Sequence, residues 1–191
     1  QGNEAVVEGA MLGGLRFFAG YPITPSTEIA EGLARRLPKV AGKFIQMEDE
    51  IGSMAAVIGA SWAGVKSMTA TAGPGLALMA EAIGLAVSAE VPIVVWDIQR
   101  IGPSTGLPTR TSQADLSFAN SMGHGDSDAI VLLPGDVFEC FEFGWKSFDI
   151  AERIQTPVFV LSDLDMGMNQ WMSKAFQYPD TPMDRGKVLT E

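Results

Sequence analysis

The fold is predicted from residues 67–88, which read SMTATAGPGLALMAEAIGLAVS. Residues 67–71 form a short run of β-branched and apolar side chains, which is typical of a buried strand. Gly73-Pro74-Gly75 then interrupts this run, and residues 76–88 have the length and composition of a helix. A strand followed by a tight turn and a helix is the repeating unit of parallel α/β sheets.

The same alternation continues on both sides of this unit. We expect strands at 16–19, 44–46, 92–98, 129–133 and 157–161, and helices at 3–13, 26–37, 49–62, near 113, and at 136–151. Asn3 and Ser26 are predicted to cap the first two helices. The sequence therefore predicts an α/β domain over residues 1–165, with a mostly parallel sheet and helices on both faces. Residues 166–191 lose this periodicity and are predicted to be a linker or an arm toward a further domain.

The helix expected at 49–62 has a regular apolar pattern. Its apolar side chains recur at helical spacing and are predicted to form its buried face: Ile51, Met54, Ala55, Ile58 and Trp62.

Composition excludes several classes of protein. Of the 191 residues 47% are hydrophobic and 19% are charged, which excludes a disordered or low-complexity chain. The formal net charge of −10 disfavours nucleic acids and membrane surfaces as partners, and no apolar run approaches the roughly 20 residues of a membrane helix. The single cysteine, Cys140, cannot form an internal disulfide, is expected to be a small buried hydrophobe, and favours a cytoplasmic location. Because residue 1 is Gln, we expect the chain to be a piece of a longer protein.

Three polar segments, 21–26, 47–50 and 100–111, each follow an expected strand. Parallel sheets bind ligands at the carboxyl ends of their strands, so these segments should meet at one edge. Glu48, Asp49 and Glu50 begin a helix, where capping and the helix dipole already explain acidic residues. One acid would suffice for that role. Glu50 leads into the apolar face, and a partly desolvated carboxylate there is suited to share a proton with a ligand nitrogen.

The other two segments allow similar alternatives. Thr24 lies between two prolines, so its hydroxyl is held ready to donate to an anion, although the segment is also a plausible helix entry with Ser26 as the cap. Arg100 and Arg110 lie in a polar loop that suits a carboxylate substrate, and a solvated surface loop is the alternative.

Two further motifs receive a structural interpretation. Gly73-Pro74-Gly75 lacks the spacing of known nucleotide- and phosphate-binding loops, so we interpret it as a tight strand-to-helix turn. His124 has no neighbouring ligand residues and is expected to be a hydrogen-bonded loop residue rather than a metal ligand.

Four segments in this order resemble the pyrimidine-binding domain of 2-oxoacid:ferredoxin oxidoreductases, in particular the alpha subunit of the 2-oxoglutarate type. They read YPITPS at 21–26, QMEDEIGSM at 46–54, TATAGPG at 69–75 and RIGPSTG at 100–106. The resemblance covers about residues 3–165, and its first and last motifs together are specific.

The resemblance implies a thiamine diphosphate site shared with a partner subunit. By motif position, Glu50 is the glutamate that faces the aminopyrimidine ring, and Pro22, Ile23 and Gly73 are expected to contact the cofactor. Thr24 and Arg100 match positions that hold the substrate's carboxylate and oxo group, and Ser104 and Thr105 are expected to line the same pocket. The beta subunit would bind the diphosphate through Mg²⁺ and carry the iron–sulfur cluster, which leaves no metal on this chain.

The implied reaction is oxidative decarboxylation of a 2-oxoacid, with 2-oxoglutarate favoured, to acyl-CoA and CO2, with reduction of ferredoxin through the partner. We expect a heteromer that is active only when the beta subunit is present. A non-oxidative thiamine diphosphate enzyme and a non-catalytic assembly module are the alternatives. The loop at 100–106 favours the oxidoreductase.

Overall fold

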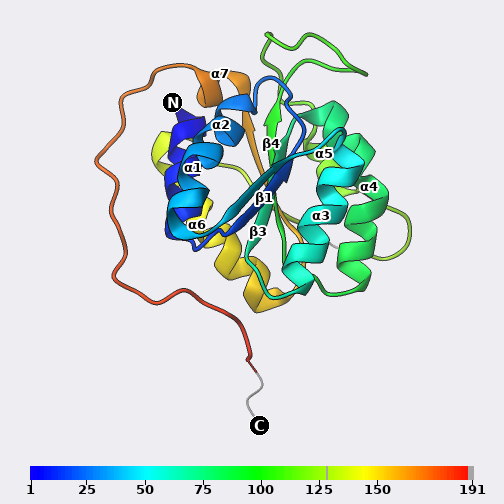
Figure 1. Ribbon diagram of the computed structural model, residues 1–191. Coiled ribbons are helices and arrows are strands. Elements are labelled where there is room, and N and C mark those ends of the chain that lie inside the picture. The colour runs from blue at the N-terminus through cyan, green and yellow to red at the C-terminus, as the bar shows by residue number, and fades with distance from the viewer. Residues whose placement is uncertain (128, 189–191) are drawn as a thin grey trace.

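The computed structural model describes residues 1–127 and 129–188, and its centre is one six-stranded sheet (Figure 1). The strand order is β2-β1-β3-β4-β6-β5, and every neighbouring pair is parallel. The predicted α/β class is confirmed, and the sheet is parallel throughout. The strands are β1 (Phe17–Gly20), β2 (Lys43–Gln46), β3 (Ser67–Thr71), β4 (Val94–Gln99), β5 (Ile130–Leu132) and β6 (Val158–Asp163).

Helices cover both faces of the sheet, as the sequence predicts (Figure 1). One face carries α1 (Gly2–Leu12), α2 (Thr27–Arg36) and α6 (Val137–Ile154), and the other carries α3 (Glu50–Trp62), α4 (Gly73–Ser88) and α5 (Leu116–Asn120). A short 3-10 helix (Leu37–Val40) follows α2, and α7 (Leu164–Met168) follows β6. None of the helices within residues 1–127 and 129–188 is both long and apolar enough to cross a lipid bilayer.

The central strand β4 shows how the two cores form. All six of its residues are buried, because β3 and β6 flank it and helices cover both sides. Val94 and Trp96 belong to the core under α1 and α6, whereas Val95 belongs to the core under α3 and α4. This alternation follows from the two-residue repeat of a strand, and it directs Asp97 to the same side as Val95.

The two predicted helix caps are wrong in their contacts. α1 begins at Gly2 with Gln1 as its N-cap, so Asn3 lies inside the helix, where its buried Nδ2 donates to the Pro25 carbonyl at 2.8 Å. Ser26 does occupy the N-cap position of α2, but its hydroxyl donates to the Ile23 carbonyl at 2.9 Å instead of accepting from the helix. Both side chains donate to carbonyl oxygens of the loop after β1. They therefore stabilise this loop instead of capping a helix.

The predicted buried face of α3 is rotated from the observed one. Met54 and Ile58 are buried, but Ile51, Ala55 and Trp62 are exposed. Ser53, Val57 and Ser61 occupy the interior instead, together with Glu50. The serine hydroxyls are satisfied there, since Ser53 Oγ donates to the Asp49 carbonyl and Ser61 Oγ donates to the Pro92 carbonyl.

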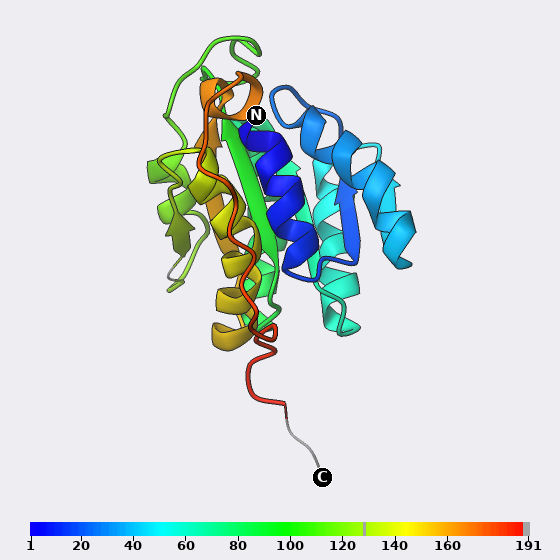
Figure 2. The ribbon, with the colours of Figure 1, turned by 90° about the vertical axis from the view of Figure 1, so that its left-hand side faces the viewer.

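Residues 169–188 have no regular secondary structure and run along the face formed by α1 and α6 (Figure 2). The Phe176 ring stacks on Phe141 with the centroids 4.4 Å apart, and the Tyr178 hydroxyl donates to Glu8 at 2.9 Å. This segment therefore packs against the domain that precedes it. Its predicted role as an arm toward a further domain stays a prediction.

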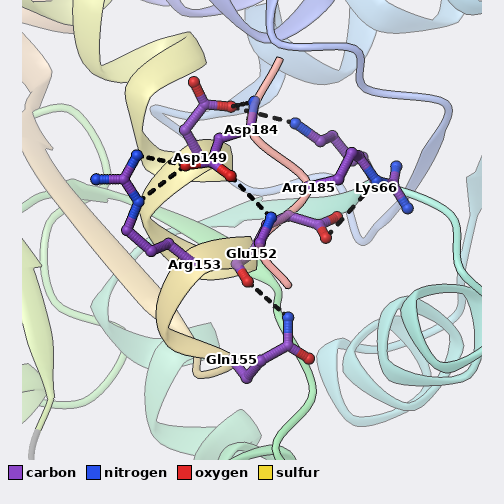
Figure 3. Close-up of polar contacts among 8 residues, drawn as sticks. Lys66, Asp149, Glu152, Arg153, Gln155, Asp184 and Arg185 are labelled. Carbon is purple, nitrogen blue, oxygen red and sulfur yellow. Dashed lines mark hydrogen bonds and ion pairs between the residues drawn. The ribbon is translucent and has the colours of Figure 1, made fainter. Parts of the chain in front are cut away.

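Charged groups hold the end of this segment to α6 (Figure 3). Arg153 forms an ion pair with Asp184, and Arg185 forms one with Glu152 at 3.7 Å. Asp149 on α6 contacts both the C-terminal segment and Lys66. One of its oxygens accepts from the Asp184 backbone N–H and also pairs with the buried ammonium of Lys66. Burial lowers the pKa of Lys66, and the charge of Asp149 opposes this shift.

Candidate functional site

The strand order creates a point where neighbouring strands continue in opposite directions. From β1 the chain moves to β2 on one side and then returns to β3 on the other side of β1. Parallel sheets bind ligands outside the carboxyl ends of strands at such a point. The predicted segments 21–26, 47–50 and 100–111 follow β1, β2 and β4, so their common edge is confirmed, and the turn at 72–75 after β3 lies between them.

Glu50 is the first residue of α3, and its carboxylate lies in the interior of this edge. The capping role belongs to Asp49, whose Oδ1 accepts from the Gly52 backbone at 2.6 Å. Glu50 itself is only 6% exposed. A Cβ atom placed on Gly75 would lie 2.7 Å from Glu50 Oε1, which shows how closely the carboxylate contacts the first turn of α4. Capping therefore does not explain Glu50, and its side chain is buried as the sequence predicts.

The turn at 73–75 depends on its two glycines because other groups approach it closely. A Cβ on Gly75 would clash with Thr71 Oγ1, and a Cβ on Gly73 would lie 2.7 Å from Asp115 Oδ1. Pro74 fits the first turn of α4, where its missing N–H is not needed. The predicted tight strand-to-helix turn is confirmed, and the contact of Gly73 with a cofactor stays a prediction.

Arg100 follows β4 and joins two loops. Its side chain is buried, with Nη1 donating to the Thr24 carbonyl at 2.6 Å and Nη2 donating to the Thr105 carbonyl at 2.8 Å. Its Nε is buried and has no hydrogen-bond partner among the described residues. Burial lowers the pKa of Arg100, whereas the charges of Asp115 and Glu50 oppose that shift. Arg100 thus lies within the electrostatic reach of Glu50, as the common edge predicts.

The loop containing Thr24 is held from two directions. Asn3 binds the Pro25 carbonyl from α1 and also donates to Glu28 Oε2 at 2.9 Å, while Arg100 binds the Thr24 carbonyl from β4. The Thr24 hydroxyl is not used in the contact with Arg100, and the residue is half-buried. Asn3 is a site residue that the sequence analysis missed, because it was assigned to a helix cap.

Other predicted residues of the loop after β1 lie nearer the surface. Tyr21 and Pro22 are exposed, and Ile23 is half-buried. Their contacts with a ligand stay predictions.

The loop after β4 projects beyond the edge of the sheet as a small hairpin (Figure 1). Ile101 and Leu107 form an antiparallel bridge, and Ser104 and Thr105 are exposed at the tip. Thr105 contacts Arg100 through its carbonyl rather than its hydroxyl. The structure therefore brings Glu50, Thr24 and Arg100 to one region and leaves the Ser104 and Thr105 side chains open to solvent, so their place in a pocket stays a prediction.

Two aspartates beneath this loop were also missed. Asp97 on β4 is completely buried, and Asp115 occupies the N-cap position of α5 without capping it. Burial raises the pKa of Asp97 well above its usual range, and the charge and hydrogen bond of Asp115 add to the shift. Burial also raises the pKa of Asp115, although Asp97 and Arg100 oppose this. The sequence signal was an acid inside the apolar run Val94-Val-Trp-Asp-Ile98.

The buried position of Cys140 and the side-chain contact of His124 agree with the sequence prediction. Cys140 is buried in the core with Sγ 3.3 Å from Met166 Sδ, and burial raises the pKa of its thiol to about 12. The exposed His124 has Nε2 at 3.4 Å from Glu81 Oε2. Within residues 1–127 and 129–188, no group of three His, Cys, Asp or Glu side chains could hold a metal ion.

An apolar surface lies on the helices that flank the site. Ile51 and Trp62 on α3, and Leu78 and Leu85 on α4, are each more than half exposed. Gly84 lies on the same helix with nothing within 4 Å of an added Cβ. Exposed large apolar side chains on neighbouring helices are typical of interaction surfaces. We call this surface the α3/α4 face.

Comparison with known proteins gives a family match over most of the chain. Residues 8–179 match the family described as "Pyruvate flavodoxin/ferredoxin oxidoreductase, thiamine diP-bdg". The chain is 59% identical over 167 residues to 2-oxoglutarate synthase subunit KorA of Methanocaldococcus jannaschii, which covers 87% of this chain and 46% of that protein. It is 44% identical over 204 residues to 2-oxoacid:ferredoxin oxidoreductase 2, subunit alpha, of Aeropyrum pernix, which covers 98% of this chain and 32% of that protein.

A solved structure gives the same result. The chain superposes on 2-oxoglutarate:ferredoxin oxidoreductase from Magnetococcus marinus, a structure with 2-oxoglutarate, coenzyme A and succinyl-CoA bound, with a TM-score of 0.85 and 55% identity. The match covers 87% of this chain and 29% of that chain. The present chain therefore spans less than half the length of these relatives.

Proposed function

Because this chain belongs to the thiamine diphosphate-binding family of pyruvate flavodoxin/ferredoxin oxidoreductases, we propose that it forms the pyrimidine-binding half of a 2-oxoacid:ferredoxin oxidoreductase active site. The proposed reaction is the coenzyme A-dependent oxidative decarboxylation of a 2-oxoacid to acyl-CoA and CO2, with reduction of ferredoxin. Relatives at 53% to 59% identity are named 2-oxoglutarate synthase subunits, and these names favour 2-oxoglutarate as the substrate.

The observation that carries the proposal is the buried carboxylate of Glu50 at the sheet edge. A carboxylate that exchanges a proton with a pyrimidine ring nitrogen should be shielded from water and should not be needed as a helix cap. Glu50 is buried, and Asp49 caps the helix in its place, so Glu50 meets both conditions. Gly73, which has no side chain, is proposed to contact the cofactor at the adjoining turn. The residues present therefore fit thiamine diphosphate, and Pro22 and Ile23 on the loop after β1 would contact it when it is bound. When bound, the cofactor supplies an electron sink for decarboxylation.

Arg100 and Thr24 are proposed to bind the 2-oxoacid. Two N–H groups of Arg100 are used by loop carbonyls, and a guanidinium has five, so donors remain for a substrate carboxylate. The Thr24 hydroxyl is positioned on the neighbouring loop, which Arg100 and Asn3 hold from both sides. Ser104 and Thr105 extend from the tip of the same hairpin and are proposed to complete this pocket in the assembled enzyme.

The α3/α4 face supports a partner subunit. Its exposed apolar side chains include Trp62 and Leu85, and burial of such side chains against another chain is favourable. We propose that a beta subunit covers this face, binds the diphosphate through Mg²⁺, and carries the iron–sulfur cluster through which ferredoxin is reduced.

The proposal is tested with Glu50→Gln, measured in the complex of this chain with its partner. Loss of the carboxylate should lower the turnover of a viologen dye, with 2-oxoglutarate and coenzyme A as substrates, by about 10²- to 10⁴-fold. Glu48→Gln is the matched control, because Glu48 lies in the same turn but is exposed, and it should keep the parent rate.

Two results would contradict the proposal. A Glu50→Gln complex with the parent rate would favour a non-catalytic assembly module. A parent complex that decarboxylates a 2-oxoacid without reducing the dye would favour a non-oxidative thiamine diphosphate enzyme.

A further inference from the structure

A fully buried carboxyl group, Asp97, and a half-buried one, Asp115, lie next to each other at the base of the 100–115 loop. Asp97 points from β4 into the side of the sheet covered by α3, α4 and α5, and its side chain is fully buried. Neither of its oxygens has a conventional hydrogen-bond donor among the described residues, and the same holds for Asp115 Oδ2. Asp97 and Asp115 lie within hydrogen-bond reach of each other, and Asp115 also lies near the charge of Arg100.

Such a pair is stable only when it holds a proton. Two carboxylates in contact without water repel each other strongly, whereas one carboxylic acid donates a strong hydrogen bond to one carboxylate. The surroundings support a single remaining negative charge on Asp115, because the cation Arg100 lies near that carboxyl. Glu50 from α3 adds a further negative charge to this region, and Asp163 at the end of β6 is already bound by Gln113 at 2.6 Å.

The two residues flank the loop that contains Arg100. Asp97 lies just before the loop that begins at Arg100, and Asp115 lies where this loop ends at α5. Gln99 Oε1, two residues after Asp97, accepts from the Asp115 backbone N–H at 3.0 Å, and this bond joins the two ends of the loop. Gly73 leaves room for the Asp115 carboxyl, since a Cβ there would lie 2.7 Å from it.

We propose that Asp97 and Asp115 share one proton, and that this acid pair closes the base of the 100–115 loop and positions Arg100 toward the 2-oxoacid. Only the positioning of Arg100 toward the 2-oxoacid rests on the proposed function. Asp97 and Asp115 are positioning residues, because they act through Arg100 and the loop rather than on the substrate.

Infrared spectroscopy of the full chain tests the shared proton directly. A protonated carboxylic acid has a carbonyl stretching band that a carboxylate lacks. We expect this band at pH 7 in the parent chain and its loss in Asp97→Asn. Asp115→Asn should shift the band, because the proton of Asp97 then bonds an amide. A parent chain without the band, or variants with an unchanged band, would overturn the proposal.

Steady-state kinetics of the complex with the partner subunit test the positioning role. Asp97→Ala should raise the KM for 2-oxoglutarate about tenfold or more, with a smaller effect on kcat, because the loop loses a charge-assisted hydrogen bond. Asp97→Asn can still donate to Asp115 and should restore a KM close to the parent value. The parent KM should rise at alkaline pH as the proton is lost, whereas that of Asp97→Asn should stay constant.

The exposed Asp126→Asn is the control for removal of an acid and should show parent kinetics. Equal KM values for Asp97→Ala and the parent would refute the positioning role. The two proposals fail separately: a parent complex that is inactive with every 2-oxoacid removes the proposed function, while the infrared result still decides whether the proton is shared.

Discussion

Gly75→Ala tests whether the contact between α4 and Glu50 sets the position of the carboxylate that we propose to be catalytic. The added Cβ would lie 2.7 Å from Glu50 Oε1 and 2.8 Å from Glu50 Cγ, and it would also clash with Thr71 Oγ1. An ordinary contact begins near 3.4 Å, so Glu50 must move by about 0.7 Å. Both neighbours are buried, so neither can swing freely into solvent.

The displacement predicts two magnitudes. Overpacking of this kind costs about 1 to 3 kcal/mol of unfolding free energy, which exceeds the gain of up to about 1 kcal/mol expected from Gly to Ala in a helix. A misplacement of about 1 Å can lower a rate by about 10²-fold, so we expect kcat to fall by roughly tenfold to 100-fold in the complex with the partner subunit.

Urea unfolding of the full chain and viologen reduction by the complex measure the two effects. Gly84→Ala is the matched stability control, because it lies on the same helix with nothing within 4 Å of its added Cβ, and it should stabilise the chain by about 0.4 to 1 kcal/mol. If Gly75→Ala is as stable as Gly84→Ala and keeps the parent kcat, the packing of Glu50 against α4 has no bearing on catalysis.

Three other perturbations test further contacts. Arg100→Lys keeps the charge, but an ammonium cannot bridge the two loop carbonyls as the planar guanidinium does. The KM for the 2-oxoacid should therefore rise about tenfold, while calorimetry should find unchanged affinity for thiamine diphosphate. An unchanged KM would remove Arg100 from the substrate site. Burial raises the pKa of Asp97 in the folded chain, so the folded state binds this proton more tightly than the unfolded state and stability is lost as the pH rises from about 4 toward the folded pKa. Asp97→Asn should therefore raise the unfolding free energy at pH 7, with the gain disappearing near pH 4, and urea titrations at both pH values that show a constant difference would contradict this. Phe176→Ala removes the ring stacked on Phe141 and should cost about 1 kcal/mol of contact, seen as faster proteolysis within 169–188, whereas an unchanged cleavage rate would show that the stack does not hold the segment.

Local patterns in the sequence were sufficient to predict the α/β class and the sheet edge that carries the site. Short strands, tight turns and helices alternate along the chain, and a parallel sheet brings the carboxyl ends of its strands together whatever their order. Glu50 could be predicted as a candidate site residue because it follows a strand and begins a helix that needs only one acid, Asp49, as its cap. These inferences use neighbours within a few residues, where spacing determines geometry.

Contacts between distant segments could be found only in the tertiary structure. Periodicity located an apolar stripe on α3, but an almost wholly apolar helix offers several such stripes, and packing left Ile51 and Trp62 outside. Arg100 reaches a carbonyl 76 positions away, on the loop after β1. Asp97 meets Asp115 because the end of β4 and the start of α5 are joined by the bond between Gln99 and the Asp115 backbone. Burial and the choice of partner are properties of the packed chain, since they depend on which surfaces exclude water. The sequence could therefore mark Asp97 as an acid inside an apolar run, but it could not identify Asp115 as its neighbour.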